Sequence, residues 1–213
     1  MEKEISNDLV GKWLKGWSLS RNLPLPTAYR SGFIVEVNDE REKSRYVFSE
    51  LNADFLHLAK TTSEPRVFLK VCTSFDRFKN AVPDHWKVQP QGYMMRCFQP
   101  MKIPDRSLHE GYRLEYGHYN STSVVKIITE NGEFAAMGRV VIIDDLAIYD
   151  RIFTESNHQR KGLATKVMME LEQIALSKGV FKNFLVATEE GRPFYQTLGW
   201  ELYSLYTSIV IPS

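Results

Sequence analysis

The sequence predicts an α/β (α+β) fold in which helices flank a mixed β-sheet. The C-terminal half alternates strand-like and helix-like segments in the order β-β-β-α-β-α-β. A helix that connects two strands of one sheet makes those strands parallel, whereas a hairpin is antiparallel, so the sheet is mixed. With 43% hydrophobic and 25% charged residues among 213, the composition is that of a globular protein able to bury a sizeable core.

The first three strands of this half are expected between residues 123 and 154. Residues 123–129 and 134–140 are apolar runs on either side of Asn131-Gly132, a pair that suits the positive φ angles of a type I′ turn. These runs therefore predict a hairpin. Residues 146–154 then supply the β-branched and aromatic residues that favour a third strand.

Helix and strand alternate over the rest of the chain. Leu163, Val167 and Leu171 recur at a spacing of four, and Gly179 provides a stop, which predicts an amphipathic helix. Residues 181–188 and 200–211 are predicted strands, and the segment between them, 190–198, is a predicted short helix that ends before Gly199.

A basic turn, residues 157–164, joins the third strand to the first helix and has the chemistry of an anion site. The first amides of a helix have no internal partner, and the helix N-terminus carries partial positive charge, so a phosphate can bind there. Gly162 and Ala164 leave room for it, while Arg160 and Lys161 add positive charge. The alternative is a surface turn in which the glycine only eases entry into the helix.

Two motifs of this half resemble those of the GNAT acyltransferases. The family loop, Gln/Arg-x-x-Gly-x-Gly/Ala, is similar to Gln159-Arg160-Lys161-Gly162-Leu163-Ala164. The family's tyrosine on a short helix, followed by Leu-Gly-Phe, is similar to Tyr195 with Leu198-Gly199-Trp200. The combination, over residues 111–211, looks like a generic bacterial subgroup of GNAT N-acetyltransferases.

This resemblance implies acetyl-CoA as the cofactor and specifies residues to bind it. In the family the loop amides hold the pyrophosphate, and the preceding strand pairs with the pantetheine arm. Thr188 stands where many members carry a CoA-contacting asparagine. The implied cofactor-binding residues are Ile152, Phe153, Thr154, Gln159, Arg160, Lys161, Gly162, Leu163, Ala164 and Thr188.

Acetyl transfer to an amine requires a base and an acid. An alkyl amine has a pKa near 10.4, so it must lose a proton before it attacks, and the departing thiolate must gain one. Tyr195 is the candidate general acid, because a phenol is protonated at neutral pH and can donate. The alternative is that Tyr195 only packs against Trp200 in the core.

Asp150 is the leading candidate for the base. It precedes Thr154 by four residues, and the period of two in a strand places both on one face. The alternative is that Asp150 pairs with Arg151, Arg139 or another cation as a structural ion pair. Three further residues are candidate bases. His158 lies beside a basic turn, where a histidine is typically solvated, and the carboxylates of Glu189 and Glu190 are expected to be exposed.

The N-terminal half is separated by a proline-containing connector, residues 99–105, so we expect two domains, 1–105 and 106–213. Ile5, Leu9, Trp13 and Trp17 recur every four residues and predict an amphipathic helix. Its tryptophans either pack in the core or form a wall of the acceptor pocket.

The N-terminal half also resembles the C-terminal half. Thr73, Trp86 and Tyr93 precede Thr188, Trp200 and Tyr206 by 115, 114 and 113 residues. We therefore expect a degenerate GNAT-like copy, with residues 52–60 as the counterpart helix. Residues 45–51 contain no glycine, so this copy would have lost its cofactor site. The alternative is a chance similarity between two common strand–helix–strand units.

Charge and composition exclude several classes of binding partner for the protein. A net charge of +1 lacks the positive field of a nucleic-acid-binding protein, and no apolar run is long enough to span a bilayer. Two cysteines without CxxC spacing predict no metal site and fit the cytoplasm, and residues 1–4 do not resemble a signal peptide. The predicted protein is a cytoplasmic N-acetyltransferase for a small-molecule, peptide or protein amine. A non-catalytic CoA sensor and a protein-interaction module are the alternatives.

Overall fold

The computed structural model describes residues 5–104 and 107–213. Residues 1–4 and the predicted domain boundary between residues 105 and 106 lie outside the described residues. Within the described parts, no helix is both long and apolar enough to cross a membrane.

Helices and strands follow the predicted order in the C-terminal half. The helices are α1 (Asn7–Ser20), α2 (Ala53–Thr61), α3 (Leu163–Ser177) and α4 (Arg192–Thr197), with the short 3-10 helices η1 (Phe75–Arg77) and η2 (Ser156–His158). The strands are β1 (Thr27–Tyr29), β2 (Gly32–Glu36), β3 (Ser44–Phe48), β4 (Val67–Val71), β5 (Lys87–Val88), β6 (Gly92–Cys97), β7 (Tyr112–Tyr119), β8 (Thr122–Thr129), β9 (Phe134–Ile143), β10 (Leu146–Thr154), β11 (Lys182–Ala187) and β12 (Glu201–Val210).

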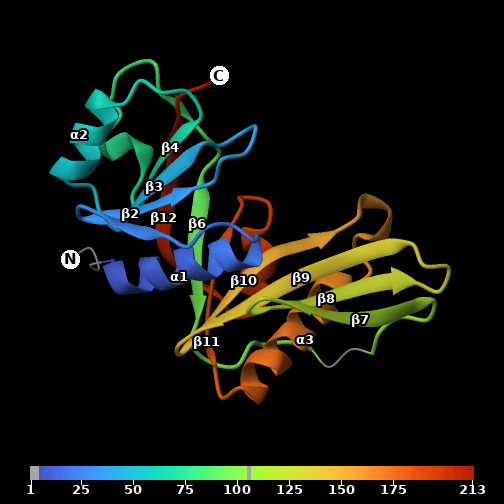
Figure 1. The fold of residues 1–213 in the computed structure, drawn as a ribbon. Coiled ribbons are helices and arrows are strands. Elements are labelled where there is room, and N and C mark those ends of the chain that lie inside the picture. Colours follow the sequence, from blue (N-terminus) through green and yellow to red (C-terminus); the bar gives the residue numbers. More distant parts are fainter. Residues whose placement is uncertain (1–4, 105–106) are drawn as a thin grey trace.

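The strands form one mixed sheet that runs through two lobes (Figure 1). Its order is β1-β2-β3-β4-β12-β6-β11-β10-β9-β8-β7, and β5 pairs with β12. The mixed sheet flanked by helices that the sequence predicts is therefore confirmed.

The two halves of the chain share one topology. In each, an antiparallel pair (β2–β3, β9–β10) leads through a helix to a parallel strand (β4, β11). The last strand of each half then pairs antiparallel with the parallel strand of the other half, β6 with β11 and β12 with β4, and β6 and β12 pair at the centre. Strand order and direction thus agree with the predicted repeat, and each half completes the other's sheet.

Helices α1 and α3 cover opposite faces of β9 and β10. Ile148 packs into the apolar cluster that contains Trp13 and Trp17 of α1, whereas the next residue, Tyr149, packs into the cluster that contains Leu171 of α3. The period of two in β10 produces this alternation. A third cluster lies under α2.

Two local predictions are corrected. Strand β7 was not predicted, because most of its side chains are exposed and it lacks an apolar pattern. The predicted type I′ turn is wrong: only Gly132 has a positive φ, at 84°, and its amide bonds to the Thr129 carbonyl. The Thr129 amide bonds to the Glu133 carbonyl, so the connection is a type I turn followed by a glycine bulge.

The contact between α1 and β10 leaves no space at Gly16. A Cβ atom there would lie 2.6 Å from Cγ1 of Ile148. We expect Gly16→Val to lower the free energy of unfolding by about 1–3 kcal/mol, because overpacking forces neighbours from their rotamers. Denaturant titration measures it. Gly117→Val is the control, since its Cβ would meet only Val124 at 3.8 Å, and a comparable loss in both variants would contradict the packing argument.

Candidate active site

A cavity opens where β10 and β11 part. The two strands pair at only three positions, ending at Ile148 and Phe184. Beyond them β10 continues along β9, while β11 continues along β6. The cavity, about 650 Å³, is lined by Ile152, Phe153, Thr154, Gln159, Arg160, Gly162, Leu163, Ala164, Thr165, Thr188, Glu190, Gly191, Phe194 and Tyr195.

The structure brings most of the predicted cofactor-binding residues together here. Of that set, only Lys161 is not among the lining residues, and its ammonium donates instead to the Tyr112 hydroxyl at 2.9 Å. Sequence reasoning did not assign Thr165, Gly191 and Phe194 to the site, because these residues carry no charge; Gly191 and Phe194 lie in the same stretches as Thr188 and Tyr195.

The N-terminus of α3 is open toward the cavity. Gly162 is the N-cap, with φ 76°, and no side chain caps the helix. Among the described residues, the amides of Leu163, Ala164 and Thr165 have no hydrogen-bond partner. These unpaired donors and the positive end of the helix dipole are suited to bind an anion.

A bulge interrupts β10 at the same cavity. The ladder between β10 and β9 is irregular between Asp150 and Phe153, and Arg151 has a positive φ of 56°. Thr154 contributes a buried hydroxyl that has no partner in the described chain. The bulge breaks the alternation on which the expected common face of Asp150 and Thr154 depended, so that expectation is wrong.

Tyr195 reaches the cavity from α4. It is 9% exposed and packs edge-on against Trp200, with ring centroids 6.0 Å apart. Burial raises the pKa of Tyr195, and the negative charge of Asp150 raises it further. The side chain is therefore protonated at neutral pH, and core packing and proton donation are compatible roles for it.

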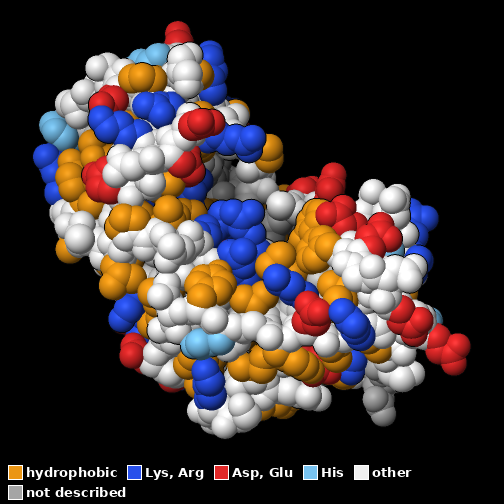
Figure 2. Space-filling view, turned by 45° about the vertical axis from the view of Figure 1, so that its right-hand side comes forward, with side chains coloured by type: hydrophobic (Ala, Val, Ile, Leu, Met, Phe, Trp, Pro, Cys, Tyr) orange, Lys and Arg blue, Asp and Glu red, His pale blue; other side chains and the backbone are white. Residues whose placement is uncertain are grey.

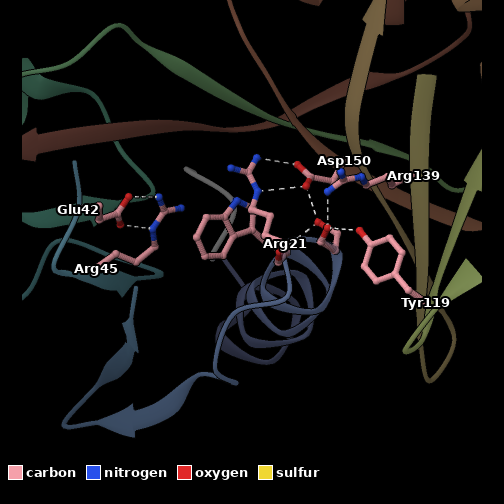
Figure 3. A network of polar contacts seen from close by, with 8 residues as sticks. Arg21, Glu42, Arg45, Tyr119, Arg139 and Asp150 are labelled. Atoms are coloured by element: carbon pink, nitrogen blue, oxygen red, sulfur yellow. Dashed lines mark hydrogen bonds and ion pairs between the residues drawn. The ribbon is translucent and has the colours of Figure 1, made fainter. Parts of the chain in front are cut away.

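Asp150 lies on the α1 face of the sheet in a bidentate ion pair (Figure 3). Its oxygens accept from Nε and Nη2 of Arg21 at 3.1 and 2.9 Å, and from the Ser20 hydroxyl. This arrangement favours the ion-pair alternative, with Arg21 as a partner that sequence reasoning did not identify because it lies 129 residues away. The role of Asp150 as base stays a prediction.

The other candidate bases differ in their surroundings. Glu190 lines the cavity, and Glu189 accepts a hydrogen bond from the Tyr93 hydroxyl. His158 is not solvated as expected: it is 7% exposed, and its Nδ1 lies 2.9 Å from the Tyr112 hydroxyl. Its position in η2, under β7, accounts for the burial.

The corresponding place in the N-terminal half has a different geometry. Strands β3 and β4 stay paired over five positions, so they do not diverge as β10 and β11 do. A cavity of about 470 Å³ lies beyond their ends, and Glu50 and Leu51 line it where the other half has its basic glycine loop. The carboxylate of Glu50 would repel a phosphate, although Arg77 also lines this cavity.

An uncapped helix N-terminus beside a parted parallel pair is an arrangement suited to an anionic ligand. The model of the acetyltransferase (GNAT) family matches residues 92–200, just over half of the chain. The chain therefore belongs to the GNAT acetyltransferase family, whose members in general use acetyl-CoA. No curated protein matches the chain.

Solved structures share the fold over most of the chain. A GCN5-related N-acetyltransferase from Kribbella flavida is 14% identical, with a TM-score of 0.68 over 98% of this chain and 96% of that one. A putative GNAT acetyltransferase from Novosphingobium aromaticivorans is 14% identical, with a TM-score of 0.60 over 95% and 98%. A tandem GNAT protein from the clavulanic acid biosynthesis pathway is 11% identical, with a TM-score of 0.62 over 84% and 78%.

Binding of CoA tests the α3 loop directly. We expect Gly162→Glu to abolish CoA binding in calorimetry, because the new side chain places bulk and negative charge beside the open amides. Gly179→Glu is the matched control: it also has a positive φ, 73°, but lies beyond the other end of α3 with no atom near its Cβ. Wild-type affinity in the Gly162 variant would contradict the assignment.

Proposed function

We propose that this acetyltransferase transfers the acetyl group of acetyl-CoA to a primary amine by direct attack in a ternary complex, with Tyr195 as general acid. One observation carries the proposal. The uncapped α3 N-terminus, the interrupted β10 ladder and the Tyr195 ring line a single cavity. The pyrophosphate of acetyl-CoA would thus face the open amides of α3, its pantetheine arm would run along β10, and its thioester would lie near Tyr195.

The residues of this cavity fit the cofactor. Open amides and Arg160 would hold its pyrophosphate, and the bulged backbone of β10, with the unpartnered Thr154 hydroxyl, would pair with its pantetheine arm. The Thr188 hydroxyl accepts from the Gly191 amide at 3.1 Å, which leaves its proton to donate. We propose that the N-terminal region, 1–105, is an accessory copy without such a site.

Bound acetyl-CoA supplies an activated acyl carbon and a sulfur leaving group. Tyr195 holds its proton because burial disfavours the phenolate. A hydrogen bond from this hydroxyl stabilises negative charge on the sulfur. So weak an acid does not release a full proton by itself. The phenol oxygen of Tyr195 would therefore take up the proton that the attacking nitrogen loses while it gives its own proton to the sulfur, so Tyr195 stays neutral and the protons balance.

The acceptor would enter from the α1 face. Beyond Ile148 and Phe184 the two strands no longer pair, and the charge of Asp150, on the α1 face, acts on Tyr195. Both oxygens of Asp150 already accept hydrogen bonds from Arg21 and Ser20. We therefore propose that Asp150 orients the acceptor side of the site and does not itself take the proton.

Removing the Tyr195 hydroxyl tests the acid. We expect Tyr195→Phe to lower turnover by roughly 10²–10⁴ with CoA affinity unchanged, as thiol release and calorimetry would measure. Tyr149→Phe is the control, because Tyr149 also packs edge-on against Trp200, at 5.4 Å, but hydrogen-bonds Asn183. Equal turnover in both variants would return Tyr195 to core packing. CoA binding without thiol release for any amine would favour the sensor.

The pH dependence of the reaction distinguishes two roles of Asp150, orientation of the acceptor and acceptance of its proton. For Asp150→Asn we expect the acidic limb of the pH–rate profile to remain and the KM for the acceptor to rise more than kcat falls, because orientation is lost and the proton acceptor is kept. Arg113→Gln, an exposed arginine of β7, serves as the control. Disappearance of the acidic limb would identify Asp150 as the base.

A further inference from the structure

A hollow lies between the two lobes, with Lys and Arg side chains gathered along its edge (Figure 2). Two guanidinium groups lie over the indole ring of Trp17, near the end of α1. The Arg45 guanidinium lies 3.7 Å from the ring centroid, and that of Arg21 lies 4.8 Å from it. Arg45 belongs to the N-terminal lobe, whereas Arg21 contacts Asp150 of the C-terminal lobe.

Each arginine uses only one edge of its guanidinium group to bind its carboxylate. Arg45 donates from Nε and Nη2 to Glu42 at 2.6 Å, and Arg21 donates from the same two atoms to Asp150 (Figure 3). In the described chain, the Nη1 group of neither arginine has a hydrogen-bond partner. Two guanidinium groups with donors to spare thus lie beside one indole, and such donors suit an anion.

Buried charge and an unpartnered hydroxyl point to the same ligand. Lys70 is 8% exposed and donates only to the Ser208 hydroxyl; burial lowers its pKa, and Arg45 and Arg21 lower it further. Arg45 also acts electrostatically on Tyr206, whose buried hydroxyl has no partner in the described residues.

The two arginines each pair with one carboxylate, Arg21 with Asp150 and Arg45 with Glu42. Lys70 has no carboxylate partner among the described residues, and burial together with the two guanidinium charges lowers its pKa. A negative charge bound at the guanidinium groups would oppose that effect. Nearby Arg139 bonds the Ser20 carbonyl at the negative end of α1.

This cluster is linked to the candidate acid through Asp150. Arg21 contacts both Trp17 and Asp150, and the negative charge of Asp150 acts on Tyr195. Asp150 is the residue proposed above to orient the acceptor, so a small molecule held at Trp17 would lie on the acceptor side of the site. The inference that follows rests on the acetyl transfer proposed above.

We propose that Trp17, Arg21 and Arg45 form the acceptor subsite and that this subsite binds a carboxylate of the acceptor. The acceptor is then an amine that carries a carboxylate, such as an amino acid. A carboxylate offers a negative charge and two acceptor oxygens to the two guanidinium groups whose Nη1 has no partner in the described chain. Trp17, from the N-terminal half, would form the wall of this pocket.

Matched amine pairs test the substrate class without any variant. Thiol release from acetyl-CoA would be measured with amino acids, their carboxamides, and phosphoethanolamine. We expect kcat/KM to be about 10- to 100-fold higher for the carboxylates than for the amides, as for loss of a charged hydrogen bond. Equal rates for acid and amide, or a preference for phosphoethanolamine, would overturn the carboxylate assignment while leaving acetyl transfer intact.

A double variant tests the subsite itself. Glu42→Gln with Arg45→Gln removes one guanidinium group without leaving its partner charge buried, and we expect the preference for carboxylates to fall to about twofold. Arg30→Gln with Asp54→Asn is the matched control, because Arg30 also lies over a ring, Tyr29 at 5.8 Å, and pairs with Asp54. A folded test variant that keeps the full preference would overturn the proposal.

Binding provides a readout that does not need turnover. N-acetyl amino acids, the expected products, would be titrated calorimetrically into wild-type protein beside their N-acetyl carboxamides. We expect only the acids to bind, and binding of neither would overturn the subsite. Absence of turnover with every amine, together with binding of the acids, would instead contradict the proposed acetyl transfer and leave the carboxylate subsite standing.

Discussion

The exchange of last strands at the centre of the sheet is the constraint on which the cleft depends. A strand that leaves its neighbour exposes a row of backbone donors and acceptors, which is costly unless another partner satisfies them. Strand β11 can leave β10 after three pairs because β6, from the other half, pairs with it as far as Ala187. The parted strands therefore stay paired on their outer sides, β11 with β6 and β10 with β9 apart from the bulge, and the rest of the sheet holds them in place.

Local sequence signals predicted the parts of the cleft that are local in the structure. The basic turn, its glycine and the apolar stripe of α3 are set by neighbours within a few residues, so their positions could be read from spacing. The Arg21–Asp150 pair could not, because it joins residues 129 apart through a topology that the spacing does not encode. The bulge at Arg151 also leaves no signal, since a non-glycine residue occupies the positive φ.

The two halves differ in how long their parallel strands stay paired. Both contain a parallel pair linked by a helix, but β3 and β4 remain together over five positions and β10 and β11 over three. Asn52 caps α2 through a side-chain bond to the Phe55 amide, whereas α3 begins at Gly162 with no such bond. An amide that is already satisfied has nothing to offer a ligand.

The same strand exchange imposes an order on biosynthesis. Strand β12 follows every other strand of the described chain, yet it lies between β4 and β6, both of which leave the ribosome more than a hundred residues earlier. Until β12 arrives, both strands present an open edge at the middle of the future sheet. The N-terminal lobe therefore cannot finish folding before β12 is synthesised, and closure of the centre is a late event that joins the two lobes.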